Sequence, residues 1–199
     1  LGGVSYRMGE EKWSVSRGGF LDNTFIGGGT GLNVPLIRGK AGYNVEAFIG
    51  KWITPDFGIR AGWRGGNVNS IWAKTFSSYV HGDFMWDATT SLLGENPNRF
   101  FQAAPYLTGG LIHLFNRRRD YERLGFEFAA CAGVYNRFRI NDRVGAYLDL
   151  SALVIPPRAG KGSFDRYFID LTATTGISYN LLAYKRHEEK MGLNRPRLE

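Results

Sequence analysis

Charged side chains recur at every second position along several segments of this 199-residue chain. Positions two apart lie on the same face of a β-strand, so such charges would gather on one side of a sheet. The set consists of Glu46, Arg60, Arg64, His81, Asp83, Asp87, Glu127, Asp149 and Asp170. Carboxylates interleaved with arginines could form a salt-bridged plug or the lining of a small pore. His81 shares a face with Asp83 and could titrate near neutral pH, which adds a proton relay to the alternatives.

No catalytic constellation accompanies these charges. His187-Glu188-Glu189-Lys190-Met191 lacks the second histidine of a zinc-protease helix, and Gly160-Lys161-Gly162 lacks the hydroxyl and the upstream glycine of a phosphate loop. Gly27-Gly28-Gly29-Thr30-Gly31 falls in a predicted strand, where glycine allows curvature or close approach. We therefore predict no catalytic, cofactor-binding or metal-binding residues.

The elements that would position the charges are strands. Apolar and polar residues alternate with period two, as in Tyr43, Val45 and Ala47 against Asn44 and Glu46, and this period is typical of β structure. Six segments alternate clearly, and two glycine-rich apolar segments, 20–34 and 101–115, are compatible with strands. The other predicted strands are 41–54, 57–64, 78–90, 125–136, 144–155 and 166–181. The sequence thus predicts eight strands.

The connections between these strands also alternate. Residues 54–56 and 140–143 are short and turn-like, whereas 65–77, 116–123 and 156–165 are longer and polar or basic. Segment 94–99 is an exception, since it falls on the short side but contains Glu95-Asn96-Pro97-Asn98. Short turns on one side and longer loops on the other are typical of outer-membrane barrels.

Composition and charge exclude several other classes of protein. The chain has 27 glycines and 15% aromatic residues, which favours strands over helices. It has no run of about 18 apolar residues, the length a membrane-spanning helix needs. The net charge of +7 is concentrated in the basic loop Arg117, Arg118 and Arg119, in Arg158 and Lys161, and in the tail beyond Lys185. No recognition helix or stacking motif accompanies these charges, so we predict no nucleic-acid partner.

The polarity of the two strand faces separates a membrane barrel from a soluble one. A membrane barrel turns its apolar face to lipid and fills its lumen with polar groups. Here one face carries bulky residues such as Ile59, Trp63 and Phe128, and the other mixes small residues with both signs of charge and little lysine. This pattern predicts a transmembrane barrel whose narrow lumen is closed by salt bridges. A soluble ligand-binding barrel is the weaker alternative.

Several short motifs resemble a known family. The last strand ends in Gly176-Ile177-Ser178-Tyr179-Asn180-Leu181, which resembles the terminal strand signal of bacterial outer-membrane proteins. Gly50-Lys51-Trp52-Ile53-Thr54-Pro55, Gly58-Ile59-Arg60, His81-Gly82-Asp83, Asn96-Pro97 and Pro105-Tyr106 together resemble OmpA-like eight-stranded barrels of Bacteroidetes. The resemblance spans 20–181. It implies a Gram-negative outer-membrane protein with periplasmic turns after the second, fourth and sixth strands, and it places 94–99 on the periplasmic side.

The predicted fold class is all-β, a closed antiparallel transmembrane barrel of eight strands. Its parts are an N-terminal extension at 1–19, the barrel at 20–181 and a polar basic periplasmic tail at 182–199. We expect it in the bacterial outer membrane, in contact with lipid, lipopolysaccharide and other outer-membrane proteins, and without a cofactor. The expected role is a structural anchor or an accessory subunit of a larger complex. A small pore and a lipid-modifying enzyme are the alternatives.

Overall fold

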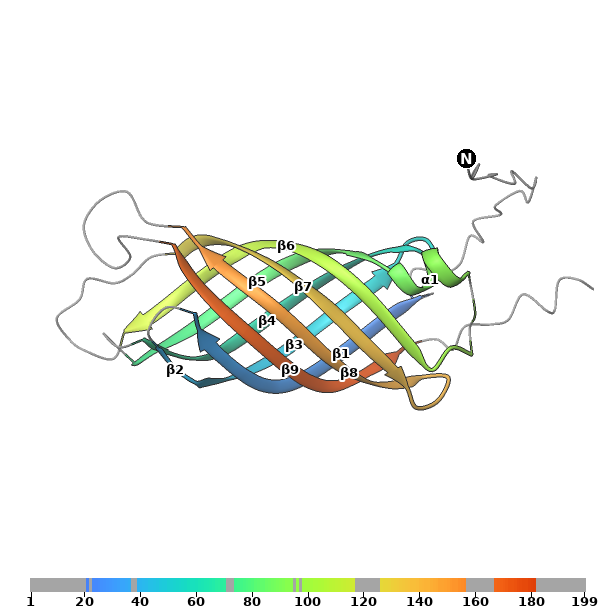
Figure 1. The fold of residues 1–199 in the computed structure, drawn as a ribbon, viewed down its shortest axis with the longest axis horizontal. Coiled ribbons are helices and arrows are strands. Elements are labelled where there is room, and N and C mark those ends of the chain that lie inside the picture. Colours follow the sequence, from blue (N-terminus) through green and yellow to red (C-terminus); the bar gives the residue numbers. More distant parts are fainter. Residues whose placement is uncertain are drawn as a thin grey trace, which may run out of the picture.

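The computed structural model describes residues 21, 23–36, 39–70, 74–94, 96, 98–116, 126–156 and 167–181. They form nine strands and one short helix (Figure 1). The elements are β1 (Thr24–Pro35), β2 (Gly39–Lys40), β3 (Gly42–Trp52), β4 (Phe57–Ser70), β5 (Lys74–Trp86), α1 (Ala88–Leu93), β6 (Phe101–Asn116), β7 (Phe126–Arg139), β8 (Val144–Ile155) and β9 (Phe168–Asn180). The predicted extension at 1–19 and tail at 182–199 lie outside the described residues.

Eight long strands close into one antiparallel barrel, and the two-residue β2 only extends the pairing at the far end of β4. Each strand pairs with its neighbours in the order β1, β3, β4, β5, β6, β7, β8, β9, and β9 returns to β1. Closure satisfies the backbone hydrogen bonds of every long strand on both sides, as a spanning segment in hydrocarbon requires. The prediction of eight strands in a closed barrel is confirmed.

The two ends of the barrel differ in how their strands are connected. The hairpins at 53–56 and 140–143 and helix α1 lie at one end, together with the start of β1 and the end of β9 (Figure 1). In the first hairpin the Ile53 amide donates to the Phe57 carbonyl at 2.9 Å, and the Phe57 amide donates to Thr54 Oγ1 at 2.9 Å. We refer to this end as the turn end and to the opposite end as the loop end.

The barrel is apolar outside and polar inside. Alternate residues of each strand point outward, and they include Val80 at 59%, Phe84 at 56% and Phe128 at 60% exposure. The intervening residues point into the lumen, where Glu46 and Asp149 are only 3% and 0% exposed. Such an arrangement would be costly in water, but it is the one expected for a sheet surrounded by lipid. Among the described residues, no helix is both long enough and apolar enough to cross a membrane.

Two predicted boundaries are wrong. The expected long loop at 65–77 is instead mostly strand, because β4 continues to Ser70 and β5 begins at Lys74, with pairing as far as Asn69 and Lys74. Backbone pairing does not need apolar side chains once a hairpin leaves the bilayer, so the polar composition there does not end the strands. The predicted strand 78–90 stops at Trp86, because Asp87 caps α1 by accepting a hydrogen bond from the Thr90 amide at 3.0 Å.

A charge placed on the outer face should test whether lipid surrounds it. Val80 is central in β5 and lies opposite Trp63 on β4 and Leu111 on β6. Val80→Arg should lower the free energy of unfolding by about 2–4 kcal/mol, the cost of arginine near the middle of a bilayer. The measurement is reversible urea unfolding of the protein in lipid vesicles.

Leu92→Arg is the matched control, because Leu92 is 76% exposed but lies on α1 at the turn end. It should cost about 0–1 kcal/mol, as at a membrane interface. Equal losses in the two variants would show that the outer face does not meet hydrocarbon.

Candidate functional site

The charged residues of the lumen meet because strand register places them opposite each other. Arg60 on β4 pairs directly with Asp83 on β5, and Arg64 on β4 pairs directly with Glu46 on β3. Opposite charges at directly opposed positions of antiparallel strands stabilise the pairing. Alternation turns all four side chains inward, so β4 carries two guanidinium groups into the lumen, one above the other.

Arg60 is the centre of the first cluster. Its Nε donates to Asp83 Oδ2, and its Nη1 donates across the lumen to Asp149 Oδ2 at 3.1 Å. The Arg60 side chain is 1% exposed, and both carboxylates are fully buried. Tyr106 then donates its hydroxyl to the other oxygen of Asp149 at 2.5 Å. One guanidinium therefore bonds to two carboxylates from opposite parts of the wall.

Aromatic rings enclose the same guanidinium. The Cζ of Arg60 lies 4.7 Å from the ring centroid of Tyr106, 4.9 Å from that of Phe48 and 5.3 Å from that of Tyr135. Desolvated contacts of this kind contribute roughly 2 kcal/mol or more. Glycine provides the necessary room, since a Cβ on Gly27 would lie 2.3 Å from the Phe48 ring. The sequence predicts that glycine in this segment allows a close approach, and the group that approaches Gly27 is the Phe48 ring.

Arg64 forms a second cluster one step closer to the loop end. Its Nε and Nη2 donate to Glu46 Oε2 at 3.2 and 2.9 Å, and its Nη1 donates to Ser151 Oγ at 3.1 Å. The Tyr147 hydroxyl donates to Glu46 Oε1 at 2.9 Å, so both oxygens of that carboxylate are bonded. Arg64 and Glu46 side chains are 9% and 2% exposed.

His81 belongs to the first cluster through Asp83. Its Nδ1 lies 2.7 Å from Asp83 Oδ1, which also accepts a hydrogen bond from Thr108 Oγ1 at 2.7 Å. Because a carboxylate paired with arginine can only accept, His81 Nδ1 must carry the hydrogen. The imidazole also stacks on Tyr79 with ring centroids 5.1 Å apart. The hydrogen bond to Asp83 and the stacking on Tyr79 hold the imidazole in one orientation against the barrel wall.

Three predicted members lie apart from these two clusters. Asp87 is buried, but it caps α1 at the turn end and accepts from Gln102 Nε2 at 2.7 Å, so its assignment to the lumen network is wrong. Asp170 is buried near the loop end, where Asn33 Nδ2 donates to it at 3.0 Å. Glu127 is half-buried on β7 opposite Ile112, and it is not among the residues bonded to Arg60 or Arg64. Arg117, Arg118 and Arg119 lie outside the described residues.

The sequence reasoning missed the neutral residues that complete the clusters, chiefly Tyr106, Tyr135, Tyr147, Thr108 and Ser151. The sequence did contain a signal for Tyr135 on β7 and for Tyr147 and Ser151 on β8, because these residues lie on the polar face of their strands. A buried tyrosine on that face needs a partner for its hydroxyl. Tyr106 was harder to identify, because its segment alternates less cleanly.

The arrangement is suited to holding the lumen closed. Within the described ranges, no group of three or more His, Cys, Asp or Glu side chains could hold a metal ion. Cys131 points inward from β7 and is 5% exposed, which agrees with a small packed residue. The charged groups at the centre are bonded to one another and covered by rings.

Comparison with known proteins supports the architecture. No family model and no curated protein matches the sequence. Neisserial surface protein A (NspA) has 7% identity and a TM-score of 0.59, over 79% of this chain and 97% of that one. The outer membrane protein OprG from Pseudomonas aeruginosa has 10% identity and a TM-score of 0.54, over 78% and 94%. The outer membrane enzyme PagL has 13% identity and a TM-score of 0.44, over 77% and 97%.

Identities this low show the fold alone. The chain has the fold of eight-stranded outer-membrane β-barrels, as predicted. The predicted location, a bacterial outer membrane, agrees with this fold and with the apolar outer face.

Removal of Arg60 should strongly destabilise the barrel. Arg60→Ala leaves Asp83 and Asp149 without their cation inside the lumen, and the expected loss of unfolding free energy is about 3–5 kcal/mol. Reversible urea unfolding in vesicles measures it. Replacing both carboxylates by asparagine in the same variant should recover part of the loss, since the charge to be buried is gone.

Arg139→Ala is the control, because Arg139 pairs with Asp142 in the turn-end hairpin, where the Asp142 side chain is 78% exposed. An exposed pair contributes about 0–1 kcal/mol. Similar losses for Arg60→Ala and Arg139→Ala would contradict a buried, coupled cluster.

Proposed function

We propose that this barrel is a non-enzymatic, non-conducting membrane component that serves as a structural anchor or as an accessory subunit of a larger outer-membrane complex. The observation that carries the proposal is the Arg60 cluster. It spans the lumen from β4 and β5 to β8, and three rings surround it. A channel would need this layer to open.

The cost of opening the layer argues against gating. An ion passing the centre would have to displace the Arg60 guanidinium from two buried carboxylates and from its ring contacts. Breaking a buried pair of this kind costs about 3–5 kcal/mol even before the aromatic contacts are counted. The layer is built on side chains of the wall strands β4, β5 and β8, so in the described part of the chain no separate plug domain forms it.

The outer surface favours the accessory-subunit form of the proposal. Outward positions on β7, β8 and β9 form a shallow hollow lined by Ala132, Leu150, Ala152, Leu171 and Ala173. The outward positions on β4 to β7 are bulkier, with Trp63, Phe84, Leu111 and Phe128. Small side chains let two membrane-embedded backbones approach closely. We propose that this hollow faces another outer-membrane protein, whereas the bulky side faces lipid.

We also propose that the chain is one of the OmpA-like barrels of Bacteroidetes and that it contacts lipopolysaccharide. The first proposal is supported by the short sequence motifs that resemble this family, and the second by the outer-membrane location.

Electrical recording tests the closed lumen. Purified wild-type protein inserted into planar bilayers should give no discrete current steps, because the Arg60 layer fills the cross-section. A general porin inserted under the same conditions provides the positive control. Stable unitary steps in the wild type that change size in Arg64→Ala would overturn the proposal in favour of a pore.

Native mass tests the accessory-subunit role. Ala173 and Ala61 both point outward, but Ala173 lines the hollow on β9 and Ala61 lies on the opposite part of the wall, on β4. After mild detergent extraction, we expect the wild type in a particle larger than one barrel, and Ala173→Trp should release it as a single barrel. Ala61→Trp should leave the particle intact. A wild-type protein that runs as a single barrel would support the anchor instead.

A further inference from the structure

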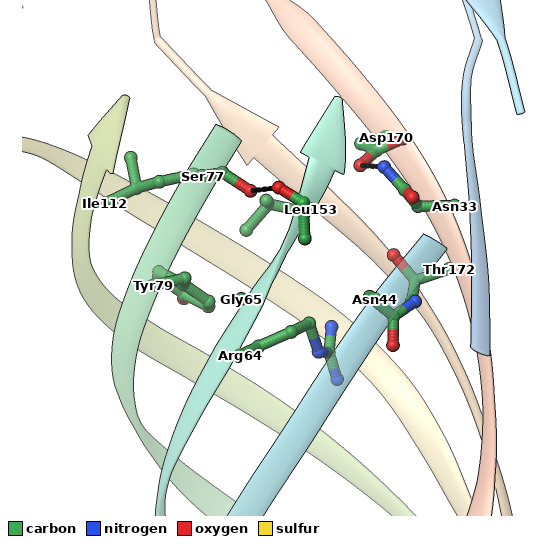
Figure 2. A pocket seen from close by; sticks show the side chains of 11 residues that line it. Asn33, Asn44, Arg64, Gly65, Ser77, Tyr79, Ile112, Leu153, Asp170 and Thr172 are labelled. Atoms are coloured by element: carbon green, nitrogen blue, oxygen red, sulfur yellow. Dashed lines mark hydrogen bonds between the residues drawn. The ribbon is translucent and has the colours of Figure 1, made fainter. Parts of the chain in front are cut away.

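A small polar cavity lies in the lumen between the Arg64 cluster and the loop end. It is lined chiefly by Asn33, Asn44, Arg64, Tyr79, Asp170 and Thr172, which reach it from β1, β3, β4, β5 and β9 (Figure 2). Its volume accessible to water is about 20 Å³. This volume is enough for one or two particles of the size of water. The cavity lies on the loop-end side of the sealed layer, so it is a separate feature of the lumen.

Three polar atoms around this cavity have no hydrogen-bond partner among the residues that the structure describes: Asn33 Oδ1, Asp170 Oδ1 and Asn44 Nδ2. Their residues are 4%, 3% and 3% exposed, so bulk water does not satisfy them. Buried polar atoms in native proteins are almost always bonded, to protein, ordered water or an ion. The three orphaned atoms therefore indicate that something polar occupies the cavity.

The hydrogen bonds already made fix which atoms face the cavity. Asn33 Nδ2 donates to Asp170 Oδ2 at 3.0 Å, as Figure 2 shows. A carboxylate can only accept, so Asn33 must turn its amide nitrogen to Asp170, which leaves its own Oδ1 unbonded. Thr174 Oγ1 donates to Asn44 Oδ1 at 2.9 Å, which leaves the Asn44 nitrogen. The atoms left to face the cavity are two acceptors, Asn33 Oδ1 and Asp170 Oδ1, and one donor, Asn44 Nδ2.

The charge balance selects the kind of occupant. Among the described residues no basic side chain lies within ion-pair distance of Asp170, and the nearest guanidinium, that of Arg64, is bonded to Glu46 and Ser151. The Arg64–Glu46 pair is neutral, so within the described part of the chain the Asp170 carboxylate leaves the cavity with one uncompensated negative charge. An anion would be repelled by the two oxygen acceptors and by this negative charge. A cation would be attracted to both oxygens and would balance the charge.

We propose that this cavity binds one small monovalent cation of the sodium type, held by Asp170 Oδ1 and Asn33 Oδ1. The Thr172 hydroxyl lines the same space, and Asn44 Nδ2 is placed to donate to an acceptor beside the ion, such as a water molecule. Calcium prefers six to eight oxygen ligands and several carboxylates, so a single carboxylate matches a single positive charge better. This site is independent of the proposed anchor or subunit role.

Cation-dependent stability tests the site. The full chain is unfolded with urea in lipid vesicles, in sodium chloride and in choline chloride at equal ionic strength, because choline is too large for the cavity. A ligand that binds only the folded state raises the folding equilibrium constant by the factor 1 + [L]/Kd, which is about 11-fold at ten times Kd. We expect sodium to stabilise the wild type in this way.

Asp170→Asn is the decisive variant, because asparagine keeps the size of the side chain and an oxygen for Asn33. It should lose the sodium dependence, and in choline chloride it should be at least as stable as the wild type, since a buried charge is removed. Asp142→Asn is the matched control: it removes an acid whose side chain is 78% exposed in a turn-end hairpin, and it should keep the full sodium response.

Two outcomes would overturn the proposal. A wild type equally stable in both salts would mean that the cavity holds only water or that Asp170 is protonated, and an equal sodium response in Asp170→Asn would mean a general salt effect. Sodium-23 NMR of the wild type supplies a readout that does not depend on how the variant folds. Excess line broadening over protein-free vesicles that is abolished by lithium competition would support the site, and its absence would contradict it.

Discussion

The structure depends on burying the Arg60 guanidinium inside a sheet that has closed on itself. An eight-stranded barrel has an interior that side chains can just fill, so each charge inside must find an oppositely charged or hydrogen-bonding partner there. Arg60 does so with Asp83 on the adjacent strand and Asp149 across the lumen, and it thereby links β4, β5 and β8. The inverted polarity of the wall follows from the same constraint, because lipid takes the apolar face and leaves the polar one inside.

Ring packing and glycine placement follow from that central group. Three rings can approach the guanidinium only where the opposing wall has no side chain, and Gly27 and Gly133 provide such places for Phe48 and Tyr106. An added Cβ on Gly133 would lie 2.6 Å from the Tyr106 ring. At these two positions glycine is therefore a packing requirement of a narrow lumen.

Period-two alternation was sufficient to predict the strands, because one face of every strand meets lipid and the other meets the lumen. It also predicted which side chains point inward, but not which of them meet. Arg60 and Asp149 are 89 positions apart, and only the closure of the barrel brings them together. Asp87 would lie on the same strand face as Asp83 if β5 continued, but β5 ends at Trp86. The Asp87 carboxylate instead accepts a hydrogen bond from a free amide in the first turn of α1. Polar residues near the loop end of β4 and β5 concealed strands that continue beyond the bilayer.

The partners of the buried charges change along the lumen axis, and this change connects the two proposals. At the centre, Arg60 is bonded to two buried carboxylates, and in our proposal this layer blocks passage. One step toward the loop end, Arg64 and Glu46 balance each other. Farther along, Asp170 has only an amide partner beside a cavity. A site that is closed below and reached only from the loop end can bind a small cation but cannot transmit it. The sealed layer that argues against a channel is therefore also what would make the cavity a terminal binding site.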